Sequence, residues 1–209
     1  MATLTWDDAA AHPHDLVAAD PPWRYDVWSG PDTPRTADRH YATMPFERIA
    51  RLPVTDLAAA DAALLLWVPC PMLKEGLLLT EAWGFSYKTV VFCWEKVNHD
   101  GSPFKGMGHY SRANVEVCLL GLRGKGLPVR ARDVGQVIRA RRREHSRKPD
   151  EFYRLTDRLF GQEVSKVELF SRTPWPGWDW VGDEASSFGA QLPLFHLLEQ
   201  VDGDDGGAL

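Results

Sequence analysis

The sequence predicts an α/β fold, in which helices cover both faces of a sheet. Segments with strand patterns alternate along the chain with segments of helical pattern, which is typical of such folds. The run at 62–68 (Ala-Ala-Leu-Leu-Leu-Trp-Val) is apolar at every position, as in a strand that is buried on both faces. Ligands of such sheets bind beyond the carboxyl ends of the strands, so functional residues are expected directly after strands.

Short apolar runs bounded by turn residues account for the strands. They predict strands at 15–19, 62–68, 86–94, 115–122, 135–140, 166–171 and 178–181.

Helical patterns fill the intervals between several of these strands. They predict helices at 46–52, 71–83 and 149–160. The last helix has Ser146 as its expected N-cap and Gly161 directly after its end. Its apolar stripe is expected at Phe152, Leu155 and Leu159, which follow the helical period.

Two long segments, 24–39 and 96–112, contain several prolines and glycines and show no apolar periodicity. Loops of this length within a compact domain usually carry function. Asp20, the 96–112 segment and Arg172 all follow predicted strands. We therefore expect them to converge on one edge of the sheet.

The length of 209 residues suits one good-sized domain, which we assign to 1–184. The remaining 185–209 is predicted to be a tail, and its end, rich in aspartate and glycine, to be disordered. The net charge of −5 argues against a general nucleic-acid-binding protein. However, ten Lys and Arg residues fall between 123 and 148, against two acidic residues. Such a basic stripe is typical of phosphate binding, and a solvated charged face is the alternative.

The remaining composition excludes several classes of protein. Three cysteines lie inside apolar runs, so we expect buried, reduced thiols and a cytoplasmic location rather than disulfides or a metal site (Cys70, Cys93 and Cys118). His12 and His14 show no metal-ligand spacing and are expected to face solvent. No apolar run is long enough to span a membrane, and the first residues do not read as a secretory signal.

The motif Asp20-Pro21-Pro22-Trp23 ends the first predicted strand abruptly. Proline fixes its own backbone and holds the preceding residue extended, so Asp20 and Pro21 should be held stiffly. The Asp20 carboxylate and the proline carbonyls then form a group of hydrogen-bond acceptors beside the flat ring of Trp23. This arrangement suits an aromatic amine, whose amino group is gripped while its ring is stacked. An ordinary strand end with a proline turn is the alternative.

Eight blocks, in order along 15–184, carry a resemblance to a known family. They are 19–23 (Ala-Asp-Pro-Pro-Trp), 41–44 (Tyr-Ala-Thr-Met), 65–68 (Leu-Leu-Trp-Val), 94–96 (Trp-Glu-Lys) with Asn98, 108–109 (Gly-His), 116–121 (Glu-Val-Cys-Leu-Leu-Gly), 146–151 (Ser-Arg-Lys-Pro-Asp-Glu) and 166–172 (Lys-Val-Glu-Leu-Phe-Ser-Arg). The chain resembles the adenine-N6 methyltransferases with an Asp-Pro-Pro-Trp motif. These include the catalytic subunit of the eukaryotic mRNA N6-methyladenosine writer and its bacterial and phage relatives.

The resemblance implies a Rossmann-like fold with S-adenosylmethionine as methyl donor. It also implies a permuted order, in which the catalytic motif precedes the cofactor-binding strand, here expected at 166–171. No Gly-x-Gly-x-x-Gly follows that strand, which argues against an NAD enzyme. The implied cofactor contacts are Asp20, Lys148, Arg172, Asp183 and Glu184. The Asp183-Glu184 pair replaces an amide pair of relatives, and Arg147 stands where relatives often carry His.

The resemblance assigns catalysis to the motif, that is to Asp20, Pro21, Pro22 and Trp23. Adenine N6 is a poor nucleophile, because its lone pair is delocalised into the ring. Asp20 and the Pro21 carbonyl would accept both N6 hydrogens and stabilise the positive charge that grows on nitrogen. Trp23 would stack the base and Tyr41 would bound the pocket. Access to the base requires a single strand or a flipped nucleotide.

Further substrate contacts are expected outside the motif. The candidates are Arg24, Tyr41, His109, Glu116 and Arg142. Glu116 lies in an apolar strand, where an unpaired carboxylate is costly, so it is expected to pair with a cation or with Asn98. The segments 24–39 and 96–112, with the run 139–143, are candidates for phosphate contact.

Several functional readings stay open. The compact form, without an RNA-binding appendage, looks bacterial or phage-like and favours DNA methylation over RNA methylation. Cytosine-N4 methylation is less expected, because related enzymes usually carry Ser or Asn in place of Asp20. The family also includes degenerate members, so a non-catalytic nucleic-acid-binding subunit is the alternative of a different class. No metal or membrane is expected, and a homodimer or a partner subunit is left open.

Overall fold

The computed structural model describes residues 4–24, 43–108, 110–143, 147–171 and 175–182. Within them the chain builds one sheet of seven strands, in the order β5-β3-β4-β2-β1-β6-β7. The strands are β1 His14–Ala19, β2 Ala58–Pro69, β3 Ser86–Val97, β4 Val115–Arg123, β5 Val137–Arg141, β6 Lys166–Leu169 and β7 Asp179–Val181.

Only β4 runs against the others among these strands. It pairs antiparallel with β2 and with β3, whereas the pairs β1–β2, β1–β6, β6–β7 and β3–β5 are parallel. The carboxyl ends of β1, β2, β3 and β6 therefore lie at one edge of the sheet, together with the beginning of β4. The predicted α/β sheet is confirmed, with this one antiparallel strand as an addition.

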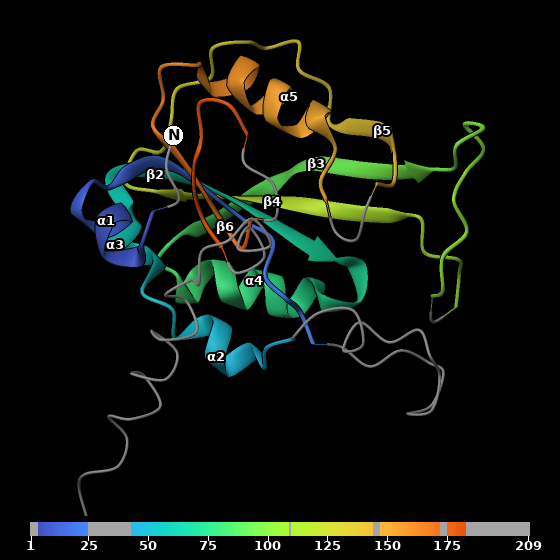
Figure 1. Cartoon of the computed structure of the whole chain (residues 1–209), viewed down its shortest axis with the longest axis horizontal. Coiled ribbons are helices and arrows are strands. Elements are labelled where there is room, and N and C mark those ends of the chain that lie inside the picture. Colours follow the sequence, from blue (N-terminus) through green and yellow to red (C-terminus); the bar gives the residue numbers. More distant parts are fainter. Residues whose placement is uncertain (1–3, 25–42, 109, 144–146, 172–174, 183–209) are drawn as a thin grey trace, which may run out of the picture.

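Helices cover the two faces unequally (Figure 1). The helices are α1 Trp6–Ala11, α2 Phe46–Ala50, α3 Val54–Leu57, α4 Leu73–Ala82 and α5 Asp150–Phe160, and a 3₁₀ turn at Cys70–Met72 precedes α4. In Figure 1, α4 and α2 lie below the sheet, α1 and α3 lie at its left end, and α5 lies above it.

Two apolar clusters fill the spaces between the sheet and these helices. Along β2, Leu64 and Leu66 belong to the cluster with α1 to α4, and Leu65 and Trp67 to the cluster with α5. All four side chains are at most 1% exposed. The alternation follows from the period of two residues in a strand. It confirms that the apolar run at 62–68 is buried on both faces.

Several predicted boundaries differ from the structure. The strands β2 and β3 are longer than predicted, and the short helices α1 and α3 were missed because neither completes an apolar helical repeat. A capping box at Thr5 and Asp8 does mark α1. Strand β6 ends at Leu169, since Phe170 has a φ of 62°.

The helix α5 begins differently from the prediction. Its N-cap is Pro149, without a side-chain cap, and Ser146 lies outside the described residues. The buried stripe follows Phe152, Tyr153, Thr156 and Phe160 rather than the predicted leucines.

The predicted exposure of His14 and the predicted burial of Cys70 were both wrong. His14 is 2% exposed, and its Nε2 lies 3.2 Å from Asp179 Oδ2, because β1 and β7 begin at the same edge of the sheet. Cys70 is exposed in the turn after β2 and Cys93 is half-buried, whereas Cys118 is buried as expected. In the part of the chain that the structure describes, no helix has the length and apolar character needed to cross a membrane. No group of His, Cys, Asp or Glu side chains among the described residues is arranged to hold a metal ion.

Candidate active site

The motif Asp20–Trp23 lies at the carboxyl edge, directly after β1. The amide of Trp23 donates to the Pro21 carbonyl at 2.7 Å, and the amide of Met44 donates to the Pro22 carbonyl at 2.9 Å. The turn is therefore held both by its prolines and by the backbone hydrogen bond from Met44. A carbonyl oxygen has two lone pairs, so the Pro21 carbonyl retains capacity for a second donor.

The prediction that Trp23 offers an open stacking surface was wrong. Its side chain is 3% exposed and belongs to the core cluster on the side of α1 to α4. Its indole N–H donates to the carbonyl of Trp67 at 3.0 Å, which ties the motif to β2. Burial of a large ring with its polar atom satisfied is favourable, so Trp23 has a structural role here.

An ion-pair chain of four residues lies at the same edge: Asp20, Lys148, Glu116 and Lys96. The Lys148 ammonium lies 3.0 Å from Asp20 Oδ2 and 2.8 Å from Glu116 Oε2. The other Glu116 oxygen accepts from Lys96. The four charges alternate in sign and come from the residue directly after β1, the segment before α5, β4 and β3.

Lys148 is the most buried member, with 4% of its surface exposed. Its ammonium lies 4.9 Å from the ring centre of Trp67 and 6.0 Å from that of Trp94, within the range of cation–π attraction. Lys148, the last member of the basic stripe at 123–148, is therefore not part of a solvated charged face. The predicted pairing of Glu116 with a cation is confirmed, while Asn98 donates to Ser102 and to the Pro103 carbonyl instead.

The ion pairs reverse the effect of burial on titration. Burial alone would raise the pKa of Glu116, but the ammonium groups of Lys148 and Lys96 outweigh it and lower that pKa to about 2. Burial alone would lower the pKa of Lys148, but the carboxylates of Asp20 and Glu116 raise it above its ordinary value. Both groups are therefore charged at neutral pH, and a fixed positive charge lies beside the Asp20 carboxylate.

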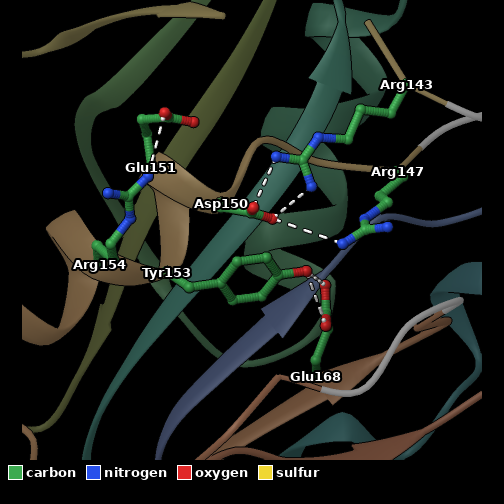
Figure 2. Close-up of polar contacts among 7 residues, drawn as sticks. All are labelled: Arg143, Arg147, Asp150, Glu151, Tyr153, Arg154 and Glu168. Atoms are coloured by element: carbon green, nitrogen blue, oxygen red, sulfur yellow. Dashed lines mark hydrogen bonds and ion pairs between the residues drawn. The ribbon is translucent and has the colours of Figure 1, made fainter. Parts of the chain in front are cut away.

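A hydroxyl–carboxyl cluster, Tyr153, Glu168 and Ser171, lies between β6 and α5 (Figure 2 shows the first two). The Tyr153 hydroxyl donates to Glu168 Oε1 at 3.0 Å, and Ser171 Oγ donates to Glu168 Oε2 at 2.8 Å. Burial raises the pKa of Glu168 to about 7, and the negative charge of Asp20 adds to the rise against the two hydroxyl contacts. This cluster therefore lies within electrostatic reach of the motif.

Sequence reasoning missed Tyr153 and Glu168 as members of this edge; it expected the segment that begins at Lys96 there but did not predict the pairing of Lys96 with Glu116. Glu168 carries the signal that pointed to Glu116, a carboxylate inside an apolar strand. Tyr153 makes both an apolar and a polar contact. Its ring stacks on Trp175, with ring centres 4.6 Å apart, while its hydroxyl donates to the Glu168 carboxylate. Lys96 belongs to the Trp-Glu-Lys block at 94–96, but nothing local in the sequence shows that it pairs with Glu116.

Some residues of the basic stripe between 123 and 148 form ion pairs within the fold, and others are exposed. Arg143 makes two bonds to Asp150, at 2.7 and 2.6 Å, and Arg147 lies 3.7 Å from the same carboxylate (Figure 2). These arginines support the beginning of α5. Arg24 and Arg142 are exposed, and the Arg142 guanidinium lies 3.8 Å from the ring centre of Phe104.

Five predicted site residues lie outside the described residues, and their placement is not tested. They are Tyr41, His109, Arg172, Asp183 and Glu184. The structure brings together Asp20, Glu116 and Lys148, and it places the β3–β4 loop (residues 98–114) at the same edge. The predicted convergence is confirmed for these parts.

Comparison with known proteins extends these observations. The family model MT-A70 matches residues 14–184. The chain belongs to the MT-A70 family. It is therefore an adenine-N6 methyltransferase by family, as its Asp-Pro-Pro-Trp motif indicated, and the family implies S-adenosylmethionine as methyl donor.

Individual relatives fall into two groups by length. Type II methyltransferase M.MunI of Mycoplasma sp is 30% identical over 196 residues, covering 86% of this chain and 81% of that protein. A probable N(6)-adenosine-methyltransferase MT-A70-like protein of Oryza sativa subsp. japonica is 31% identical over 187 residues, 88% of this chain. The N(6)-adenosine-methyltransferase catalytic subunit METTL3 of Homo sapiens is 28% identical over 186 residues, also 88% of this chain. This chain spans 24% of the rice protein and 29% of the human protein.

Proposed function

We propose that this MT-A70 protein transfers the methyl group of S-adenosylmethionine to the N6 amino group of adenine in DNA. The observation that carries the proposal is the Asp20 carboxylate, held by the buried ammonium of Lys148 at the carboxyl edge of the sheet. Similarity to the type II methyltransferase M.MunI over most of both chains favours DNA. RNA methylation is the second candidate, because N(6)-adenosine methyltransferases match nearly the same part of this chain.

The groups at this edge fit S-adenosylmethionine. The methionine end of the cofactor carries one carboxylate and one ammonium, and the edge offers buried groups of both signs in Lys148 and Asp20. Lys148 would hold the carboxylate, and Asp20 would accept from the ammonium. Arg172, Asp183 and Glu184 remain the expected contacts to the rest of the cofactor. When bound, the cofactor supplies an electrophilic methyl group on a sulfonium, which already has a good leaving group.

The work left to the protein is positioning and electrostatics. Asp20 would accept one N6 hydrogen and the second lone pair of the Pro21 carbonyl the other, so that the N6 lone pair faces the methyl group. The Asp20 carboxylate would also stabilise the positive charge that develops on N6. The proton can leave after methyl transfer, so Asp20 does not need a raised pKa. Arg24, Tyr41, His109, Glu116 and Arg142 remain proposed substrate contacts.

The order of strands supports the permuted arrangement within a Rossmann-like fold. Strand β6 lies between β1 and β7 in the sheet but follows β1 by more than a hundred residues in the chain. If β6 is the first strand of the cofactor-binding half, the catalytic motif precedes it in sequence. The domain proposed at 1–184 ends where the family match ends.

The test is transfer of label from S-adenosylmethionine to duplex DNA, single-stranded DNA and RNA of matched sequence. Asp20→Asn keeps the shape of the side chain and removes its charge. We expect label on adenine N6 of DNA, and at least a roughly 100-fold lower rate in the variant. Asp133→Asn, on an exposed residue paired with Arg158, is the matched control and should keep full activity.

The outcomes separate the candidates. Label on RNA alone would select the second candidate. Cofactor binding without label on any of the three nucleic acids would contradict an autonomous enzyme and favour a non-catalytic subunit. Equal rates for Asp20→Asn and the parent protein would remove Asp20 from the mechanism.

A further inference from the structure

The β3–β4 loop (residues 98–114) begins and ends beside the ion-pair chain. Lys96 and Glu116, which pair with each other, precede and follow it in the chain. The amide of Lys96 donates to the Asn114 carbonyl at 2.8 Å, which closes the base of the loop. Figure 1 shows the loop projecting beyond the end of the sheet toward which β3 points. A substrate strand whose adenine enters at Asp20 would meet this loop.

The loop has a defined backbone structure that internal hydrogen bonds hold in place. The Phe104 amide donates to the Lys96 carbonyl at 3.0 Å, and the Gly106 amide to the Ala113 carbonyl at 2.9 Å. A Cβ at Gly106 would lie 2.5 Å from that same carbonyl oxygen, and a Cβ at Gly108 would lie 2.1 Å from the Ser111 carbonyl oxygen. Glycine is therefore required at both positions for the strands of the loop to approach so closely.

Two arginines attach the loop to β5. The Arg142 guanidinium covers the ring of Phe104 at 3.8 Å. Arg139 lies 3.6 Å from the Glu95 carboxylate and donates to the Gly101 carbonyl at 3.4 Å. The loop and the end of β5 consequently form one continuous surface.

The side chains on this surface are aromatic and basic. Tyr110 is fully exposed, at 101%, and Met107 is 43% exposed. Lys105, Arg112 and Arg142 are exposed as well. The loop's own acid, Asp100, is engaged internally, since its carboxylate accepts from the amide and the hydroxyl of Ser102. In a chain of net charge −5, this surface is locally positive.

We propose that the exposed side chains of Lys105, Tyr110, Arg112 and Arg142 bind the unpaired strand that flanks the target adenine. Aromatic rings and guanidinium planes stack on bases only where those bases are unstacked from a duplex, while lysine and arginine neutralise the phosphates. Tyr110 stacks on a base next to the target, and the three cations follow the backbone. This inference rests on the proposed function and names the form of nucleic acid that the site takes.

The experiment measures the Kd of a fluorescent single-stranded oligonucleotide and of its duplex, with parent protein, Tyr110→Ala and Tyr87→Ala. Tyr87 is 43% exposed at the beginning of β3, the end of that strand opposite the loop, and is the matched control. Loss of one stacked base corresponds to about a 10-fold rise in Kd for Tyr110→Ala on the single strand. We expect a smaller rise on the duplex and none for Tyr87→Ala.

A second pair of variants tests the charges. Lys105→Gln should reduce the slope of log Kd against log salt by roughly 0.7 on the single strand. Lys88→Gln, an exposed lysine near the beginning of β3, should leave the slope unchanged.

Three outcomes would overturn the inference. In the first, the parent protein binds and methylates nucleic acid while Tyr110→Ala binds as tightly as the parent, which leaves the proposed function standing. In the second, Tyr110→Ala changes the molar mass measured by light scattering, which makes the surface a protein interface. In the third, the parent protein binds no nucleic acid at all, and the proposed function fails with the inference.

Discussion

Two glutamates at the same edge of the sheet, the half-buried Glu116 and the buried Glu168, have pKa values shifted in opposite directions. Glu116 and Glu168 both lie in apolar strands and both face α5. The pKa of Glu116 is lowered to about 2, because two ammonium groups outweigh its burial. The pKa of Glu168 is raised to about 7, because burial outweighs its two hydroxyl donors. The partner, not the residue type or its burial, decides whether a buried carboxylate keeps its charge.

The opposite pKa shifts of Glu116 and Glu168 give the two clusters different roles at this edge. Glu116 and Lys148 keep their charges across the physiological range, and the Lys148 ammonium so provides a constant field beside Asp20. The hydroxyl–carboxyl cluster changes its charge near neutral pH and so makes the same edge sensitive to pH. Three substitutions, each with a comparison variant, test this division.

The largest effect is expected for Lys148→Met, which leaves two carboxylates without their shared cation. Breaking a buried ion pair by removing one partner is costly, so we expect the free energy of unfolding to fall by about 3 kcal/mol. We expect the methylation rate to fall roughly 100-fold, because Asp20 loses the group that orients it. Urea denaturation and single-turnover assays measure the two quantities.

Lys96→Met is the matched control for this substitution. Lys96 pairs with Glu116 alone among the members of the ion-pair chain, and 18% of its side chain is exposed, against 4% for Lys148. Its loss should cost about 1 kcal/mol. Equal losses in the two variants would contradict the central position of Lys148.

The next effect is the pH dependence of stability. Glu168 has a raised pKa in the folded protein, so its contribution to stability is complete below its ordinary value of 4.5 and is lost as the pH rises through about 7. Relative to Glu168→Gln, the parent protein should lose up to roughly 3 kcal/mol across that window. Urea unfolding from pH 4 to about 8.5 measures the slope.

Glu116 provides the comparison with the opposite sign. Its lowered pKa contributes stability that is present above its ordinary value of 4.5 and is lost as the pH falls through about 2. Glu116→Gln should therefore leave the slope between pH 5 and about 8 unchanged. A flat profile in the parent protein over that range would refute the assignment to Glu168.

The smallest effect is expected for Tyr153→Phe. The substitution removes the hydroxyl that donates to Glu168 at 3.0 Å, so the charged carboxylate loses a stabilising donor. The pKa of Glu168 should rise further, which moves the inflection of the stability profile to higher pH. At neutral pH the cost should be about 1 kcal/mol. An unchanged inflection of the stability profile would show that the Tyr153 hydroxyl does not stabilise the charged form of Glu168. Tyr87→Phe serves as the control.

Local sequence patterns were enough to predict most of the fold. Every predicted strand and helix has a counterpart in the structure, because apolar runs and their periods report burial directly. The rigid turn at Asp20–Trp23 was also predictable from the sequence, since two prolines after an acid restrict the backbone whatever surrounds them. Family membership followed from blocks that are each local in the sequence.

The contacts within the candidate site could be predicted from the sequence only in part. The predicted cation partner of Glu116 is Lys148, which lies 32 positions away and lies beside Glu116 only because α5 packs on the sheet. Lys96 joins them because β3 pairs with β4 so that Trp94 lies opposite Glu116. Such pairings depend on strand register, which no local pattern records.

The sequence by itself determined the α/β class, the acceptor motif at a strand end and the family chemistry that goes with it. Only the tertiary structure decided which charges meet, that Trp23 is buried rather than open, and that Glu168 is held by hydroxyls while Glu116 is held by ammonium groups. The physical reason is the range of each interaction. Backbone restriction and apolar periodicity act over a few residues, whereas ion pairing and desolvation depend on whatever the fold brings within a few ångströms.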